Sequence, residues 1–227
     1  MKKKSIYITC GIFITIAIVA MFVFIFGGEN TFDSEKIDVE GTWKVATYIN
    51  SENITLVDDE YMVFDLEKAT NYRNGAVYLE SRYLMEDNST IKLKDINCEY
   101  RVEKYTDNYI RLYENKNVYM DLIKCFDADL SEKVIDTSIV SGRWNVIYRQ
   151  TDQVIVDEYL VFEDEVMSDY RNGEAVPVLV SDYSWQYGNH LIAESLGKDM
   201  VLNIISDNII ILIETDTGYI MELHKAN

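Results

Sequence analysis

The stretch that decides the fold is Asp59-Glu60-Tyr61-Met62-Val63-Phe64-Asp65, because it returns as Asp157-Glu158-Tyr159-Leu160-Val161-Phe162-Glu163. Three further segments return in the same order: Gly41-Thr42-Trp43 as Gly142-Arg143-Trp144, Tyr72-Arg73-Asn74-Gly75 as Tyr170-Arg171-Asn172-Gly173, and residues 118–124 as 219–225. The two copies stay about 98 to 101 residues apart. A period of this length lets each copy form its own core, which indicates tandem domains and not a solenoid.

Each copy consists of short runs rich in Val, Ile, Tyr and Thr, separated by turn residues every 8 to 12 residues or so, a spacing typical of all-β barrels and sandwiches. The strands predicted in the first copy span residues 41–50, 60–66, 69–73, 76–84, 90–96, 98–105, 108–114 and 118–124. Those predicted in the second copy span residues 142–149, 158–163, 166–171, 174–185, 189–195, 198–205, 208–214 and 218–225.

Short connections make neighbouring strands antiparallel. Asn74-Gly75 and Asn172-Gly173 predict type I′ turns, since both central residues of that turn need positive φ. Asp107-Asn108 and Asp207-Asn208 mark a second hairpin by the same chemistry. Strict alternation in the first strand places Trp43, Val45 and Thr47 on one face.

The predicted fold class is therefore all-β, with two tandem small antiparallel up-and-down barrels of about eight strands each behind one transmembrane helix. The domains are expected at residues 37–125 and 138–227, joined by a linker at 126–137.

Residues 1–28 stand apart from the repeats. Lys2, Lys3 and Lys4 precede an uncharged run from Ser5 to Phe26, which is long enough as a helix to cross a bilayer. A cleaved signal peptide and a lipidated Cys10 are the alternatives. The basic side of the run predicts that the N-terminus lies inside and the repeats lie outside the cytoplasm.

The chain carries a net charge of −18. Such a surface repels phosphate backbones, so nucleic-acid binding is not expected. The acidic runs 58–60 and 163–165 lack the ligand spacing of an EF-hand, and no His or Cys cluster has zinc spacing. The only imidazoles, His190 and His224, both lie in the second copy. We therefore expect no metal, no cofactor and no enzymatic activity.

Cys98 and Cys125 both belong to the first copy and have no counterparts in the second. An oxidising compartment permits a disulfide between them, but the fold does not require one. A disulfide and two inert thiols both remain open.

A Gly-x-Trp at the start of the first strand, followed by about eight short strands with Asp-Asn in the penultimate hairpin and a basic residue at the end of the last strand, resembles the bacterial lipocalin-like domain. The resemblance covers residues 37–125 and 138–226. It implies a small barrel closed at one end by a tryptophan that packs against a basic side chain from the last strand. The residues matching this pattern are Gly41, Trp43 and Lys124 in the first copy and Gly142, Trp144 and Lys225 in the second. The chain lacks the long loop over the barrel mouth found in larger lipocalins, which argues against a deep pocket.

Three further groups of residues are candidates for recognition. Tyr72-Arg73 and Tyr170-Arg171 precede tight turns, where an arginine can reach a bound carboxylate, or they are ordinary strand residues. Tyrosines crowd the last strands of the first copy, as recognition residues or through strand propensity; the candidates among them are Tyr100, Tyr109 and Tyr113. Ile210 and Leu212, or their alternates in the strand 209–213, are expected to be covered from outside, by the first barrel or by a partner.

These observations favour a membrane-anchored, extracytoplasmic, non-enzymatic binding module for small apolar or amphipathic ligands. The alternative is a cell-surface scaffold with filled barrels that binds a protein partner.

Overall fold

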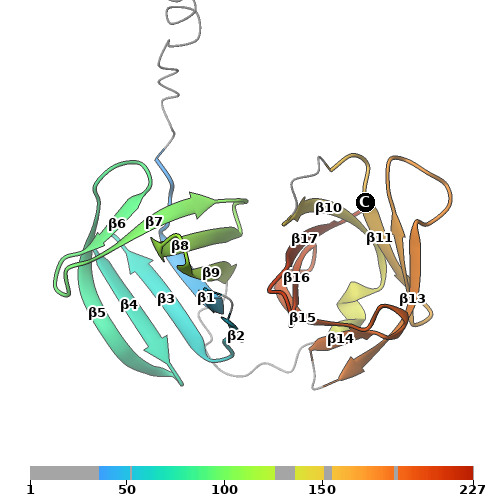
Figure 1. Cartoon of the computed structure of the whole chain (residues 1–227), viewed down its shortest axis with the longest axis horizontal. Coiled ribbons are helices and arrows are strands. Elements are labelled where there is room, and N and C mark those ends of the chain that lie inside the picture. The colour runs from blue at the N-terminus through green and yellow to red at the C-terminus, as the bar shows by residue number, and fades with distance from the viewer. Residues whose placement is uncertain (1–35, 52, 126–135, 151–154, 187–188, 227) are drawn as a thin grey trace, which may run out of the picture. The chain divides into compact units, whose positions relative to one another are not determined.

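The computed structural model describes residues 36–51, 53–125, 136–150, 155–186 and 189–226. Within them each repeat forms a closed antiparallel barrel of eight strands, so the predicted pair of all-β barrels is confirmed (Figure 1). The predicted anchor, residues 1–28, lies outside the described residues, as do residues 126–135 of the predicted linker. Among the described residues, none belongs to a helix both long enough and apolar enough to span a membrane.

Barrel 1, residues 41–125, is built from β1 and β3 to β9. Its strands are β1 (Gly41–Asn50), β2 (Asn53–Leu56), β3 (Glu60–Asp65), β4 (Lys68–Arg73), β5 (Ala76–Met85), β6 (Thr90–Leu93), β7 (Cys98–Lys104), β8 (Tyr109–Asn115) and β9 (Val118–Cys125). Pairing of β1 with β9 closes the barrel. The sequence-based prediction missed β2, a short strand that pairs with the end of β1 and is no part of the ring.

Barrel 2, residues 142–225, follows a 3-10 turn at Thr137–Val140. Its strands are β10 (Gly142–Arg149), β11 (Tyr159–Glu163), β12 (Val166–Tyr170), β13 (Leu179–Gln186), β14 (His190–Ala193), β15 (Lys198–Ser206), β16 (Ile209–Glu214) and β17 (Ile220–Lys225), with a second 3-10 turn at Glu194–Leu196. Pairing of β10 with β17 closes the ring (Figure 1).

The turns differ from one another in backbone chemistry. Asn74 and Gly75 both have positive φ, as do Asn172 and Gly173, which agrees with the predicted type I′ turns. The predicted strand 174–185 is wrong at its start, because β13 begins only at Leu179. Pro177 lies in the segment between, where it has no N–H to donate to a ladder.

The hairpins at Asp107-Asn108 and Asp207-Asn208 form without positive φ. In both, a hydroxyl two residues before the asparagine accepts a hydrogen bond from its backbone N–H. Thr106 Oγ1 accepts from Asn108 at 3.1 Å, and Ser206 Oγ accepts from Asn208 at 3.3 Å. The predicted hairpin is present, but the predicted reason for it is wrong.

A β-bulge interrupts the first strand of each barrel at the same place. The pairing register shifts between Val45 and Thr47 in β1, and between Val146 and Tyr148 in β10. A bulge sets two residues opposite one, so the alternation of faces reverses beyond it. Thr47 consequently leaves the face of Trp43 and Val45, contrary to the predicted alternation, and its hydroxyl donates to Asp121 on the outside at 2.6 Å.

The interior of each barrel holds a separate apolar core. The core of barrel 1 includes Trp43, Phe64 and Leu122, and the core of barrel 2 includes Trp144 and Phe162. In each repeat the chain just before the first strand joins this core, through residues 37 and 39 and residues 139 and 140.

A third apolar cluster lies between the repeats. It joins Ala46, Tyr109 and Ile123 of the first repeat to residues of the second, namely Ile205, Ile211, Ile213 and Ile220. The sequence predicted that one face of the strand 209–213 is covered from outside. This holds for the residues that alternate with Ile210 and Leu212, namely Ile211 and Ile213. Ile210 and Leu212 themselves are wrong as interface residues, because they belong to the interior core of barrel 2. A shift of one residue exchanges the two faces of a strand.

Adjacent residues of β16 allow the two faces to be tested. Ile210→Ala removes interior packing and Ile211→Ala removes packing between the repeats, and each should lower the free energy of unfolding by about 2–5 kcal/mol. Hydrogen exchange followed by mass spectrometry separates them. Ile211→Ala should raise exchange in the β9 peptides of barrel 1. Ile210→Ala should change exchange only in peptides of barrel 2. Equal exchange profiles for the two variants would contradict the assignment of faces.

Candidate functional site

The tryptophans of the repeated Gly-x-Trp plug one end of each barrel. Trp43 is 1% exposed, its indole Nε1 donates to the Val39 carbonyl at 2.8 Å, and the Lys124 ammonium lies 5.3 Å from its ring centroid. Such a cation–π contact adds about 0.5–2 kcal/mol. The glycine two residues earlier, Gly41, has φ +119, a conformation that L side chains rarely adopt. The group is a structural closure of the barrel.

The second repeat builds the same closure. Trp144 donates from Nε1 to the Val140 carbonyl at 2.7 Å, and the Lys225 ammonium lies 5.2 Å from the ring centroid. Lys225 also donates to the Ile139 carbonyl at 3.1 Å. Gly142 has φ +106. The tryptophan end is therefore packed in both barrels and offers no entry for a ligand.

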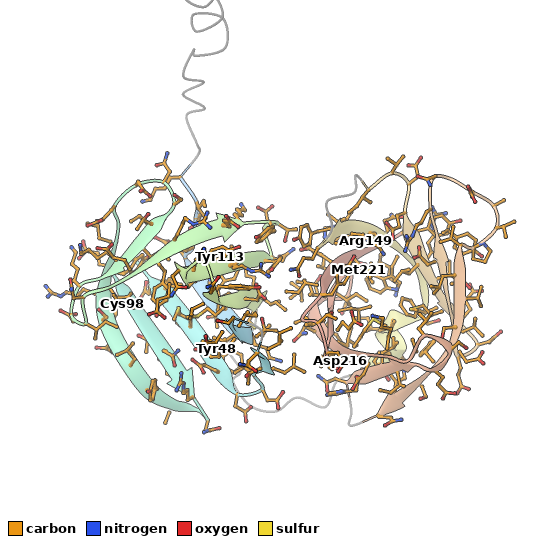
Figure 2. All side chains as sticks on the ribbon, in the orientation of Figure 1. Tyr48, Cys98, Tyr113, Arg149, Asp216 and Met221 are labelled. Atoms are coloured by element: carbon orange, nitrogen blue, oxygen red, sulfur yellow. The ribbon has the colours of Figure 1, made fainter. Side chains whose placement is uncertain are left out.

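Further along the same strands, the interior of each barrel becomes polar. The bulge directs Tyr48 inward, where it is paired across the strands with Met120; Arg149 is paired in the same way with Met221. Residues paired across antiparallel strands share a face, and both methionines belong to the interior cores. Tyr48 and Arg149 thus occupy equivalent places in the two barrels, and both are marked in Figure 2.

In barrel 1, four side chains form a closed set around one carboxylate. Glu60 is 4% exposed, and its Oε1 accepts from the Tyr48 hydroxyl at 2.6 Å and from Asn71 Nδ2 at 2.6 Å. Arg73 Nε lies 2.9 Å from Oε2, and the guanidinium stacks 3.9 Å from the centroid of the Tyr78 ring. We call Tyr48, Glu60, Asn71 and Arg73 the polar cluster of barrel 1.

In barrel 2 the equivalent positions carry two ion pairs. Arg149 Nη2 lies 2.6 Å from Glu158 Oε1, and the two side chains are 12% and 5% exposed. Arg171 donates from Nε and Nη2 to Asp169 Oδ2 at 3.0 and 2.6 Å. We call Arg149, Glu158, Asp169 and Arg171 the polar cluster of barrel 2. Its two pairs adjoin, since Arg171 Nε also lies 3.5 Å from Glu158 Oε1.

Both clusters contain buried atoms without a hydrogen-bond partner among the described residues. These atoms are Asp169 Oδ1 and Arg149 Nε in barrel 2, and Asn71 Oδ1 and Arg73 Nε in barrel 1. Glu158 Oε1 accepts no hydrogen bond of good geometry, although the 2.6 Å contact with Arg149 marks it as ion-paired. Barrel 2 therefore holds an unpaired carboxylate oxygen where barrel 1 holds a neutral amide oxygen.

Burial dominates the electrostatics of both clusters. It raises the pKa of Glu158, and the nearby Asp169 carboxylate adds to this effect while Arg149 opposes it. Burial also raises the pKa of the Tyr48 hydroxyl, and its hydrogen bond to Glu60 adds to the rise. The Tyr48 hydroxyl thus remains a protonated donor to Glu60.

The arginines predicted as binding residues lie in these clusters, but the tyrosines next to them do not. Tyr72 and Tyr170 alternate with Arg73 and Arg171 along the strands and so face outward. On the outside of barrel 2, the ring of Tyr170 stacks on that of Tyr159, with centroids 4.6 Å apart.

The other predicted tyrosines divide between inside and outside. Tyr100 packs against the interior core of barrel 1. Tyr109 is fully buried in the cluster between the repeats, and its hydroxyl donates to Asp121 Oδ1 at 2.7 Å. Its ring lies 5.6 Å from that of Tyr148 in the second repeat. Tyr113 lies on the same outer face and donates to Glu103 Oε2 at 3.0 Å.

Cys98 and Cys125 are both free thiols, so the structure contains no bridge between these two residues. Burial raises the pKa of the Cys125 thiol.

The two histidines lie outside the polar clusters. His190 Nδ1 lies 3.0 Å from Asp199 on the neighbouring strand, and His224 Nε2 lies 2.7 Å from Glu222 Oε1. Glu222 in turn accepts from Asn108 Nδ2 of the first repeat at 2.9 Å. This carboxylate therefore links the two repeats. Over the described part of the chain, no three His, Cys, Asp or Glu side chains are arranged to hold a metal ion.

Sequence reasoning missed six of the eight cluster members as site residues, namely Tyr48, Glu60, Asn71, Arg149, Glu158 and Asp169. A signal was present for two of them. Glu60 and Glu158 stand in the same alternation as Met62 and Phe64, and as Leu160 and Phe162, so their charge falls on the inward face. The inward position of Tyr48 and Arg149 depends on the bulge.

Comparison with known proteins gives likenesses of fold only. No family model matches the chain, and no curated protein matches it. Two solved structures resemble it over about one repeat. One is an uncharacterized protein from Bacteroides eggerthii, with 17% identity, a TM-score of 0.33, and coverage of 38% of this chain and 99% of that one. The other is a lipocalin-like protein from Bacteroides uniformis, with 16% identity, a TM-score of 0.32, and coverage of 39% and 99%.

The raised pKa of Glu158 predicts a pH dependence of stability. Because its pKa is higher in the folded chain than its ordinary value of 4.5, the folded chain binds this proton more tightly than the unfolded chain. This contribution to stability is fully present below the ordinary value and is lost as the pH rises through the raised pKa. Glu158→Gln should remove that part of the pH dependence.

Denaturant unfolding at a series of pH values between about 4 and 8 measures the effect. Glu163→Gln is the control, since Glu163 is an exposed carboxylate at the end of β11, the strand that Glu158 directly precedes. Identical pH profiles for the native chain and Glu158→Gln would show that the environment of Glu158 is not the one described.

Proposed function

We propose that this chain is a non-enzymatic, extracytoplasmic binding module, held at the membrane by residues 1–28, which binds a small amphipathic ligand at the polar clusters of its barrels. The observation that carries the proposal is the recurrence of a buried polar cluster at the same place inside both barrels. Residues of both signs approach one another there, from strands that the bulge and the tight turn bring together.

Structural need alone is a weak explanation for such clusters. Burying charges costs several kcal/mol per ion, and apolar residues of similar size often stabilise a core equally well or better. Both repeats nevertheless keep a buried glutamate beside a partly exposed arginine at equivalent positions. Retention of such groups inside a small barrel favours a role in recognition.

The packing at the tryptophan end limits what the ligand can be. Trp43, Phe64, Trp144 and Phe162 are each 2% exposed or less, and they fill the interior at that end. A long apolar molecule inserted along the barrel axis would clash with them. A ligand with a polar group directed to the cluster and an apolar part at the mouth suits the arrangement better.

The location outside the cytoplasm rests on the N-terminal sequence. The uncharged run from Ser5 to Phe26 follows three lysines and precedes an acidic segment. The positive-inside rule then directs the repeats outward. The strongly acidic repeats also suit an attachment to the membrane through the anchor and not through the barrel surface.

A second candidate is a scaffold that binds another protein. It is favoured by exposed valines on barrel 2, among them Val176 at 70%, Val180 at 51% and Val178 at 50% exposed. Exposed apolar groups of this kind suit a protein contact. In this case the polar clusters would have a structural role inside the barrels and would bind no ligand.

Native mass spectrometry of the full chain, extracted from the producing cell into lipid nanodiscs, separates the two candidates. We expect a bound small molecule whose mass is lost on Arg149→Met with Arg73→Met, and retained in Glu163→Gln. A ligand-free chain with a co-purified protein would favour the scaffold. Circular dichroism of the double variant establishes that the barrels are folded.

Topology can be tested in intact cells of the source. Protease added outside should digest the repeats and leave the N-terminal segment protected. Retention of the full-length chain in intact cells, with digestion after lysis, would place the repeats in the cytoplasm and contradict the proposed location.

A further inference from the structure

The two polar clusters are unequal, and the inequality indicates where a ligand binds. In barrel 1 the carboxylate of Glu60 is contacted by Tyr48, Asn71 and Arg73. In barrel 2 the tyrosine is replaced by Arg149 and the asparagine by Asp169. The exchange leaves Asp169 Oδ1 without a partner among the described residues, although Asp169 is only 4% exposed.

An unpaired buried carboxylate oxygen calls for a hydrogen-bond donor. A buried acceptor without a hydrogen-bond partner costs about 1–3 kcal/mol or more of stability. A ligand that donates a hydrogen bond to it would recover this free energy on binding. Asp169 and Glu158 lie beside one another, since Arg149 Nη2 is 2.6 Å from Glu158 Oε1 and 3.9 Å from Asp169 Oδ2. Arg149 Nη2 already pairs with Glu158 Oε1, so Asp169 Oδ1 is the carboxylate oxygen left open to a further donor.

An anionic ligand is disfavoured at the same place. Arg171 already donates twice to Asp169, through Nε at 3.0 Å and Nη2 at 2.6 Å. An anion would have to displace that carboxylate and would then face it. Burial is the largest cause of the raised pKa of Glu158, and the neighbouring Asp169 carboxylate adds to it, so the cluster already disfavours negative charge. The net charge of −18 attracts a cation over longer distances.

Two apolar side chains are candidates for contact with the stem of such a ligand. Tyr219 packs against the core of barrel 2, and burial raises the pKa of its hydroxyl, with Glu158 and Asp169 adding to the rise and Arg149 and Arg171 opposing it. Val156 is 49% exposed, and its carbonyl accepts from the N–H of Asn172, directly after Arg171. A ligand held by the cluster would thus lay an apolar stem against these side chains.

We propose that the polar cluster of barrel 2 binds a primary ammonium group on an apolar stem, with Asp169 Oδ1 as acceptor. This inference rests on the proposed binding function and assigns it to one barrel and one ligand chemistry. The ammonium can belong to a small amphipathic amine or to a lysine side chain of a protein partner. Barrel 1, with Asn71 in place of Asp169, does not bind it.

The methionines supply a matched pair of reporters. Met221 is paired with Arg149 in barrel 2, and Met120 is paired with Tyr48 in barrel 1. The Met221 position is marked in Figure 2, close to that of Arg149. NMR of the full chain labelled with ¹³C-methyl methionine, in nanodiscs, therefore observes both barrels in one spectrum.

Hexylammonium, hexanol and hexanoate are the probes, because they share a stem and differ in the head group. Hexylammonium should shift the Met221 resonance in a saturable way and leave Met120 unchanged, and the other two probes should shift neither. Asp169→Asn should weaken the binding by about tenfold or more, as expected for loss of a charge-assisted hydrogen bond. Glu163→Gln should bind like the native chain.

Each other result has a defined meaning. Nα-acetyl-lysine methylamide repeats the titration: a shift of Met221 by this probe points to a protein partner, and a shift by hexylammonium alone points to a small amine. A response to hexanol or hexanoate in place of hexylammonium overturns the ammonium assignment and leaves the proposed function standing. Equal shifts of Met120 and Met221 overturn the assignment to barrel 2. If neither methionine resonance shifts and native mass spectrometry finds no bound molecule, the proposed function is overturned as well.

Discussion

The β-bulge in the first strand of each repeat is the constraint on which the interior of both barrels depends. Before the bulge, the strand directs a tryptophan and a valine inward, and these close and fill one end. After the bulge, the reversed alternation directs Tyr48 or Arg149 inward. Without it these side chains would face out, and the buried carboxylates of Glu60 and Glu158 would lose a partner.

The bulge also supplies the contact between the repeats. The two residues that it sets outward in β1, Ala46 and Thr47, lie opposite Asp121. Asp121 accepts from Thr47, Tyr109 and Arg111, which orders the outer face of barrel 1. At the equivalent place in barrel 2, Glu222 accepts from Asn108 of the first repeat. One backbone irregularity thus serves the interior and the exterior at once.

Duplication explains why the two barrels share their backbone features and differ in their polar clusters. The tryptophan closure, the Asn-Gly turn and the bulge are present in both, and each of them is needed to close a small barrel. The polar clusters keep Glu60 and Arg73, or Glu158 and Arg171, and change the two residues beside them. A set with one ion pair becomes a set with two, and an unpaired amide oxygen becomes an unpaired carboxylate oxygen, by two side-chain differences at equivalent positions.

The sequence by itself determined the repeat, the two eight-stranded barrels and the Asn-Gly turns. These features follow from local patterns, because alternation and turn chemistry act over a few residues. Only the tertiary structure decided which face each side chain occupies. Ile210 and Leu212 turned inward, and Thr47 turned outward, because register and bulges are set by pairing with distant strands. For the same reason Arg149, Glu158 and Asp169, far apart in sequence, met inside one barrel.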